Sequence, residues 1–129
     1  MALCNNGAIV IVADREWAQE RGLKPLAEIL GYSAAAKAGL KLSDMDLIEI
    51  NEAFAAQVIV CHREMPFDME KLDVHGGAIA LGHPIGATGA KIVTTLINAL
   101  DQRDKELGIR HCFRLHRRWA GRSYDARKM

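Results

Sequence analysis

The sequence predicts an α/β fold with a layered sheet, because short apolar runs typical of strands alternate with segments of helical periodicity. The chain has 129 residues, half of them hydrophobic, which is enough for one domain with a modest core. Aromatic residues make up only 5% of it, so we expect an aliphatic core. The longest apolar run, residues 8–13, has the length of a strand and is too short to span a membrane as a helix.

Strand and helix signals follow each other through the first half of the chain. Residues 7–13 (GAIVIVA) form a β-branched run, which favours a buried strand. Asp14 is suited to cap the helix that follows, and Gly22 to end it. We expect a strand over residues 7–13, a helix over 15–22 and a second strand over 23–33. A short Ala-rich helix over 34–43 and a third strand over 44–51 follow.

The second half of the chain contains two further helical patterns. A helix is expected after residue 51, and a short strand near Val74. The longest helix is expected over residues 86–105. The apolar stripe of the first helix comprises Phe54, Val58, Cys61 and Met65, with Cys61 expected in the core, and that of the last comprises Val93, Leu96, Ile97 and Leu100.

A glycine-rich segment, HGGAIALGHPIGATGAK at residues 75–91, leads into the last helix. Its small residues let backbone or a ligand approach closely, and Pro84 suits the entry to a helix. The positive end of the helix dipole disfavours a charged ring on His83. A neutral imidazole both donates and accepts a hydrogen bond, so His83 is a candidate general base or oxyanion donor. A buried, hydrogen-bonded structural histidine is the alternative.

A second polar cluster, NEAFAAQ at residues 51–57, stands where the third strand passes into a helix. Open α/β sheets keep their sites at the carboxyl ends of strands, which makes Asn51 and Glu52 candidates. Asn51 also suits the simpler role of a helix cap.

Together, EINEAFAAQ and VHGGAIALGHPIGATGAKI closely resemble the C-terminal half of a thiolase. The resemblance covers about residues 3–109 and implies a thiolase-like layered fold, a mixed sheet with alternating helices. Thiolases are acyl-CoA C-acyltransferases that form or cleave 3-ketoacyl-CoA. The related ketoacyl synthases have a histidine motif where this chain has Asn-Glu-Ala-Phe, so the resemblance favours a thiolase.

The resemblance also implies a mechanism and a set of site residues. A cysteine in the N-terminal half of a thiolase takes up the acyl group, and a second one, in a Cys-x-Gly-Gly-Gly motif, moves the α-proton. His83 would activate the first cysteine and Asn51 would orient a water in the same oxyanion hole. Gly82, Ala53 and Phe54 would contact the substrate. The substrate is a coenzyme A thioester, no separate cofactor or metal takes part, and the family forms homo-oligomers.

Three departures from the family lead us to expect that the chain is inactive alone. The N-terminal half, with its acyl-accepting cysteine, has no counterpart, and neither Cys4 nor Cys61 lies in a matching motif. The connection GYSAAAKAGL is shorter than in the family and lacks a Met-Gly-x-Gly-Pro turn. As a lesser change, His75 stands where the family more often has Asn. Finally, no Cys-x-Gly-Gly-Gly motif is present.

Composition changes abruptly at Arg110, which divides the chain into an incomplete thiolase domain, 1–109, and a basic tail, 110–129. The first part carries ten Lys/Arg and fifteen Asp/Glu, and the tail seven Lys/Arg and one Asp. With free codon choice, the tail read one base later encodes Ala-Thr-Val-Ser-Ala-Cys-Thr-Gly-Gly-Gly and onward, with the Cys codon spanning Leu115 and His116. We therefore expect an out-of-frame, poorly ordered tail that replaces the last strands.

Other functions of the tail are weaker alternatives. Its cations and three aromatic residues resemble a nucleic-acid patch, and its His and Cys residues, like Cys61–His62, hint at a metal site. The residues concerned are Phe113, Trp119 and Tyr124, and His111, Cys112 and His116. The spacing matches no established zinc pattern, so no metal, nucleic acid or membrane partner is expected.

Three scattered cysteines suit a reducing compartment, and no signal peptide is visible. We therefore expect a cytoplasmic protein, or a mitochondrial or peroxisomal one in a eukaryote. Two functional hypotheses follow. The chain is either the C-terminal portion of a thiolase-type acyltransferase, working with a partner that supplies the nucleophile, or a non-catalytic remnant or interaction fragment from a damaged gene. The second is favoured for the chain alone.

Overall fold

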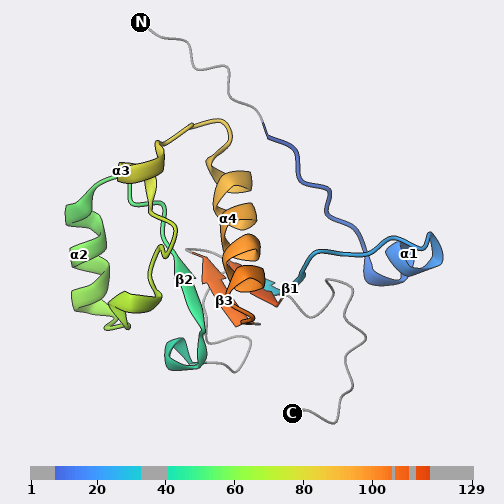
Figure 1. Ribbon diagram of the computed structural model, residues 1–129, viewed down its shortest axis with the longest axis horizontal. Coiled ribbons are helices and arrows are strands. Elements are labelled where there is room, and N and C mark those ends of the chain that lie inside the picture. The colour runs from blue at the N-terminus through green and yellow to red at the C-terminus, as the bar shows by residue number, and fades with distance from the viewer. Residues whose placement is uncertain (1–7, 33–40, 106, 111–112, 117–129) are drawn as a thin grey trace, which may run out of the picture.

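The computed structural model describes residues 8–32, 41–105, 107–110 and 113–116 (Figure 1). A four-stranded mixed sheet has the order β1-β4-β3-β2. β2 and β3 are parallel, whereas β4 runs antiparallel to both β1 and β3. The strands are β1 (Glu28–Tyr32), β2 (Leu47–Glu49), β3 (Leu107–Arg110) and β4 (Phe113–His116). The fold is therefore α/β, as the alternation of strand and helix signals predicted.

Helices lie on both sides of β2, the short strand that leads to the polar cluster. α4 packs against β2 and β3, and α2 packs through Val58 against the other face of β2. Among the described residues, no helix has the length and apolar character needed to cross a membrane. The helices are α1 (Arg15–Glu20), α2 (Ala55–Glu64), α3 (Ala78–Leu81) and α4 (Thr88–Gln102), with 3-10 turns at Leu42–Asp44 and Met69–Lys71.

Two apolar clusters form the core, one on each face of β2. Alternate residues of a strand point to opposite faces, so Leu47 meets α4 while Ile48 and Ile50 meet α2. The apolar stripe predicted for the last helix is confirmed, because all four of its residues pack in the first cluster. The first cluster contains Leu47, Leu96, Ala99 and Leu100 with Val93 and Ile97 beside them, and the second contains Met45, Ile48, Ile50 and Val58.

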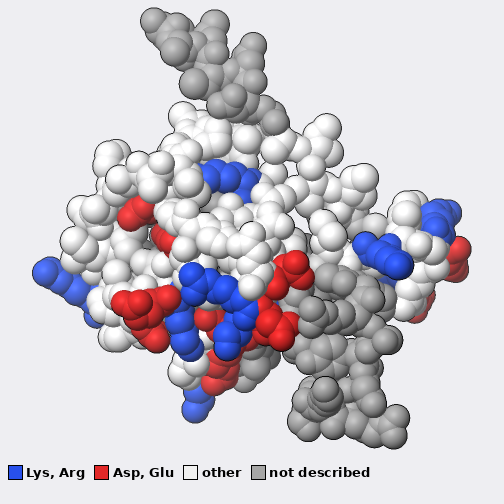
Figure 2. Space-filling model, in the orientation of Figure 1, with Lys and Arg blue, Asp and Glu red and all other residues white. Residues whose placement is uncertain are grey.

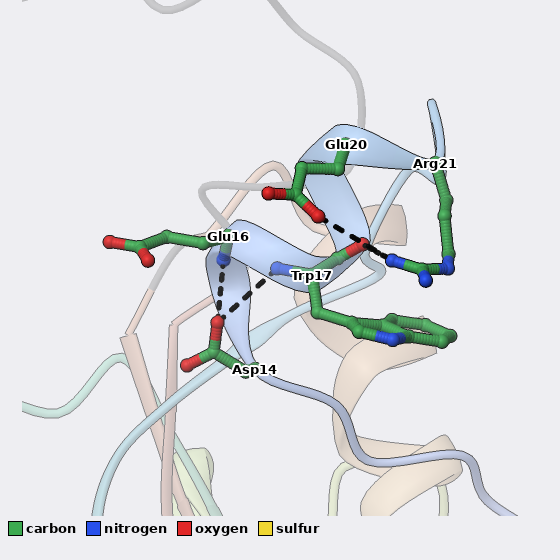
Figure 3. A network of polar contacts seen from close by, with 5 residues as sticks. All are labelled: Asp14, Glu16, Trp17, Glu20 and Arg21. Carbon is green, nitrogen blue, oxygen red and sulfur yellow. Dashed lines mark hydrogen bonds and ion pairs between the residues drawn. The ribbon is translucent and has the colours of Figure 1, made fainter.

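The cap predicted for the first helix is also confirmed. The Asp14 carboxylate accepts hydrogen bonds from the backbone N–H groups of Glu16, at 2.8 Å, and Trp17, at 3.3 Å (Figure 3). The Arg21 guanidinium lies 4.2 Å from the centre of the Trp17 ring. Gly22 follows the helix with φ +62°, a conformation that glycine adopts without strain. α1 is thus held by local contacts and by an ion pair between Arg15 and Glu28 of β1, and Figure 1 shows it apart from the other helices.

The prediction of a buried strand over residues 7–13 is wrong for the residues that the structure describes. Residues 8–13 run toward α1 (Figure 1) and belong to no strand of the sheet. The side chains of Ile9 and Ile11 are 93% and 85% exposed. A β-branched run becomes a buried strand only when a neighbouring strand and a covering layer are available, and the described part of this chain offers neither here.

The stripe predicted for the helix after Asn51 is wrong at both ends. α2 begins only at Ala55, so Phe54 is its N-cap and Met65 its C-cap, and both side chains are exposed. Val58 alone is buried, and Cys61, expected in the core, is half-buried. One turn of α2 meets the core, and the rest of the helix lies at the surface.

Several other expectations are met in part or lie outside the described residues. The strand expected near Val74 is a single parallel bridge between Leu72 and Ile48. The second and third strands are present as β1 and β2. Most of the helix expected over 34–43 falls on residues 33–40, which the structure does not describe.

The tail supplies a strand where poor order was expected. The backbone of Phe113–His116 forms β4, between β1 and β3. Residues 111–112 and 117–129 lie outside the described residues. The boundary at Arg110 and the out-of-frame origin of the tail therefore stay predictions.

Candidate active site

Asn51 and His83 lie side by side, although 32 positions separate them in the sequence. The Asn51 side-chain nitrogen Nδ2 is 3.2 Å from His83 Nε2. Asn51 follows the end of β2, and His83 lies in the glycine-rich segment between α3 and α4. The two motifs singled out in the sequence therefore meet just beyond the carboxyl end of β2, in agreement with the shared oxyanion hole that the resemblance implied.

Three backbone contacts hold the segment before α3 against the end of β2. The Asp73 N–H donates to the carbonyl of Ile48, and the Ile50 N–H donates to the Asp73 carboxylate, each at 2.8 Å. The Ala78 N–H donates to the carbonyl of Asn51 at 3.0 Å. α3 therefore starts beside Asn51, and this short helix carries the chain to His83.

Gly77 is required for this close approach. A Cβ atom placed on Gly77 would lie 2.6 Å from the Cβ of Glu52 and 2.9 Å from Asp73 Oδ2. Glu52 itself has a positive φ of 51°, which is uncommon for a residue other than glycine. The backbone is thus tightly fitted where the two motifs meet.

The other ring nitrogen of His83 also has a partner. His83 Nδ1 is 2.8 Å from the Thr88 hydroxyl, which lies 2.9 Å from the carbonyl of Pro84. α4 begins at Thr88, so His83 lies before the helix and not in its first turn. Lys91, one turn further along α4, donates to the carbonyl of Gly82 at 2.6 Å. α4 therefore holds the histidine segment at two points.

Two carboxyl groups, Glu49 and Asp73, lie behind the site. Burial, together with the charge of Asp73 and a hydrogen bond to it, raises the pKa of Glu49 from 4.5 to about 8. Burial, with the charge of Glu52, raises the pKa of Asp73 from 3.8 to about 6, although its hydrogen bonds with Ile50 and Glu49 oppose this. The positive charge of Lys91 lowers the pKa of both. At neutral pH, Glu49 therefore holds its proton.

The residues expected to contact substrate lie around this pair. Phe54 is 75% exposed, Ala53 is half-buried, and Gly82 is exposed with φ +88°. Figure 2 shows acidic and basic side chains interleaved along the lower edge of the visible face. The upper part, where Figure 1 places α3 and the start of α4, is mainly uncharged apart from one basic patch. In the described part of the chain, no cluster of three or more His, Cys, Asp or Glu residues could hold a metal ion.

Four residues at or behind the site were not anticipated from the sequence: Glu49, Asp73, Thr88 and Lys91. One signal for Glu49 was available, since a lone carboxylate within an apolar strand has to be buried or neutralised. The other three act through contacts between segments, which a linear pattern does not display.

The comparisons with known proteins agree with this arrangement. Residues 19–113 match the family model for the thiolase C-terminal domain. The chain is 46% identical over 125 residues to an acetyl-CoA acetyltransferase of Escherichia coli (strain K12), covering 81% of this chain and 32% of that protein. It is 43% identical over 130 residues to a 3-ketoacyl-CoA thiolase of Cronobacter sakazakii (strain ATCC BAA-894), with 84% and 34% covered.

Solved structures show the same relationship. The crystal structure of the Bacillus anthracis acetyl-CoA acetyltransferase matches with a TM-score of 0.75 and 38% identity, over 79% of this chain and 33% of that one. The crystal structure of human mitochondrial 3-ketoacyl-CoA thiolase matches with a TM-score of 0.77 and 32% identity, over 81% of this chain and 34% of that one.

The chain belongs to the thiolase C-terminal domain family, and its fold is thiolase-like. It spans about a third of the length of the curated relatives that it matches. The alignment with the Escherichia coli protein has more positions than 81% of this chain contains, so that relative has extra residues inside the matched region.

Proposed function

We propose that this chain is the C-terminal portion of a thiolase-type acyltransferase, and that His83 and Asn51 serve acyl transfer between coenzyme A thioesters. The contact between the Asn51 amide and His83 Nε2 is the observation that carries the proposal. Relatives named acetyl-CoA acetyltransferase and 3-ketoacyl-CoA thiolase support the reaction class, which is the formation or cleavage of 3-ketoacyl-CoA.

In this proposal, the nucleophilic cysteine comes from a segment that this chain does not contain. His83 accepts its proton, and the resulting thiolate attacks the thioester carbonyl. Negative charge then develops on the carbonyl oxygen, where hydrogen-bond donors fixed beforehand lower the barrier by several kcal/mol. Asn51, whose amide nitrogen lies 3.2 Å from His83 Nε2, orients a water in the same site.

The substrate fits the surface around His83. The thioester end of an acyl-CoA is uncharged, as is most of the surface near α3 and the start of α4 (Figure 2). Gly82, Ala53 and Phe54 contact this part of the substrate. Coenzyme A thioester is itself the substrate, and no separate cofactor takes part. We also propose that the protein forms a homo-oligomer and is cytoplasmic.

A non-catalytic remnant or interaction fragment is the second candidate. The sequence has three cysteines, and none lies in a Cys-x-Gly-Gly-Gly motif. We therefore expect the 129-residue chain alone to leave acetoacetyl-CoA cleavage by coenzyme A at background. Turnover that His83→Ala abolishes would show that the chain needs no second portion.

A chimera tests the site itself. Residues 41–105 of this chain replace the matching segment of the Escherichia coli acetyl-CoA acetyltransferase, which supplies the cysteines. We expect acetoacetyl-CoA cleavage to persist and to fall about a hundredfold or more with His83→Ala, the scale of lost general-base catalysis. His75→Asn, a change at an exposed histidine of the same segment, is the matched control. A folded chimera with no activity, or one indifferent to His83→Ala, would overturn the proposal.

A further inference from the structure

We propose that Thr88 is a positioning residue that fixes the tautomer of His83 and keeps the Nε2 lone pair directed toward Asn51. The idea that this matters for acyl transfer rests on the proposed function, whereas the tautomer is inferred from the hydrogen-bond contacts. Three distances carry the argument: Nδ1 to the Thr88 hydroxyl, that hydroxyl to the Pro84 carbonyl, and Nε2 to Asn51 Nδ2.

The Thr88 hydroxyl has one hydrogen and two neighbours. The carbonyl of Pro84, at 2.9 Å, can only accept a hydrogen bond, so the hydroxyl hydrogen points to it. The hydroxyl oxygen can then only accept from His83 Nδ1, at 2.8 Å. The hydrogen of a neutral His83 ring is therefore on Nδ1.

The remaining ring nitrogen then carries a lone pair. Asn51 faces it with its amide nitrogen, a donor, at 3.2 Å. The four groups form one chain of donors that runs from Asn51 through His83 and Thr88 to the Pro84 carbonyl. If the Asn51 oxygen faced the ring instead, two acceptors would meet. The state of Thr88 thus determines the orientation of both other side chains.

This arrangement suits a base that must take one proton. When a thiol S–H bond breaks, Nε2 exchanges its hydrogen bond from the Asn51 amide for the thiol proton, the sulfur becomes a thiolate and the ring becomes positively charged. Thr88 still accepts from Nδ1–H in that state, so it supports the ring before and after the transfer. Its partners His83 and Pro84 lie within six residues of it, so the support comes from the turn that leads into α4.

The test is the ¹⁵N spectrum of the ring nitrogens in the labelled full-length chain, at a pH high enough that histidine rings are neutral. The His83 signals are assigned with His83→Gln. We expect a protonated Nδ1 and an unprotonated Nε2 in the native protein and in Thr88→Ser, which keeps the hydroxyl. Thr88→Val should give a mixture of the two tautomers.

Thr94→Val is the matched control, because the Thr94 hydroxyl bonds only to the α4 carbonyls of Ala90 and Lys91. Backbone amide spectra report whether each variant folds. A native ring protonated at Nε2, or a Thr88→Val ring that keeps the native tautomer, would overturn the inference.

Kinetics in the chimera separate this inference from the proposed function. Thr88→Val should lower kcat by about tenfold with little change in KM, because positioning of a base acts on the chemical step. Thr88→Ser should restore it. An inactive chimera with the expected tautomer would remove the proposed function and leave the role of Thr88 in place. An active chimera whose His83 ring is protonated at Nε2, or whose kcat does not fall in Thr88→Val, would overturn the role of Thr88 and leave the proposed function in place.

Discussion

Glu49 is a buried acid on the strand that leads to the site, only 3% exposed. In the unfolded chain it releases its proton near its ordinary pKa of 4.5, whereas in the folded chain the pKa is about 8. The folded state thus binds this proton more tightly. Its contribution to the free energy of unfolding is complete below pH 4.5 and is lost as the pH rises through about 8. The raised pKa of Asp73 also stabilises the folded chain at low pH, and this contribution is lost as the pH rises through about 6.

We expect Glu49→Gln to flatten this dependence. The amide cannot ionise, so the variant should lose less stability than the native chain between pH 4.5 and pH 8. Denaturant unfolding at a series of pH values measures the difference. Glu64→Gln changes an exposed carboxyl on α2 and should leave the slope as it is. Equal slopes for Glu49→Gln and the native chain would show that the Glu49 carboxyl does not hold the extra proton.

At the scale of elements, the site depends on how closely the segment before α3 approaches the end of β2. A Cβ on Gly77 would meet the Cβ of Glu52 at 2.6 Å, close to the backbone and unable to swing away. Gly77→Ala should therefore displace α3 and cost about 1–3 kcal/mol, as overpacking does. It should also separate Asn51 from His83.

Gly89→Ala provides the control for that change. A Cβ on Gly89 meets nothing within 4 Å, and in a helix alanine is favoured over glycine by about 1 kcal/mol. Gly89→Ala should be neutral or slightly stabilising in thermal unfolding. If Gly77→Ala is as well tolerated, the two segments are more loosely fitted than these distances require.

The elements also show what a sequence can predict. The stripe of α4 was predicted correctly because four apolar residues recur at helical spacing and all face one core cluster. The cap at Asp14 was predicted because capping is local. Residues 8–13 were predicted wrongly, since a strand requires a partner that its own sequence does not reveal. α3 was missed because its four residues, AIAL, are too short to show a period.

The site residues also differ in whether the sequence could reveal them. Asn51 and His83 were found because each lies in a motif of adjacent residues, and the resemblance implied that both serve one oxyanion hole. Thr88 was not found, although only a few residues separate it from His83. Its role depends on the turn between Pro84 and α4, which brings its hydroxyl back to the ring. Motifs identify the reacting groups, and three-dimensional contacts identify what orients them.

At the scale of the whole molecule, the order β1-β4-β3-β2 makes β4 an inner strand that joins β1 to the rest of the sheet. Its residues, Phe113–His116, belong to the tail that begins at Arg110. An inner strand needs apolar side chains on the face of the sheet that packs against the core, and a tail with seven Lys/Arg is poorly suited to this burial. An out-of-frame tail would therefore weaken the part of the sheet in which β4 joins β1 to β3.

This leads to a genetic prediction. Reading the gene one base on from the Arg110 codon should reveal an open frame that encodes Cys-x-Gly-Gly-Gly. Restoring that frame should make thermal unfolding more cooperative and raise the midpoint, by roughly 2–8 °C for each kcal/mol gained. The restored frame with its cysteine changed to serine is the control that separates packing from thiol chemistry. No such frame in the DNA, or no gain on restoring it, would leave the basic tail as a genuine part of the protein, and its seven cations would then call for a binding assay with nucleic acid.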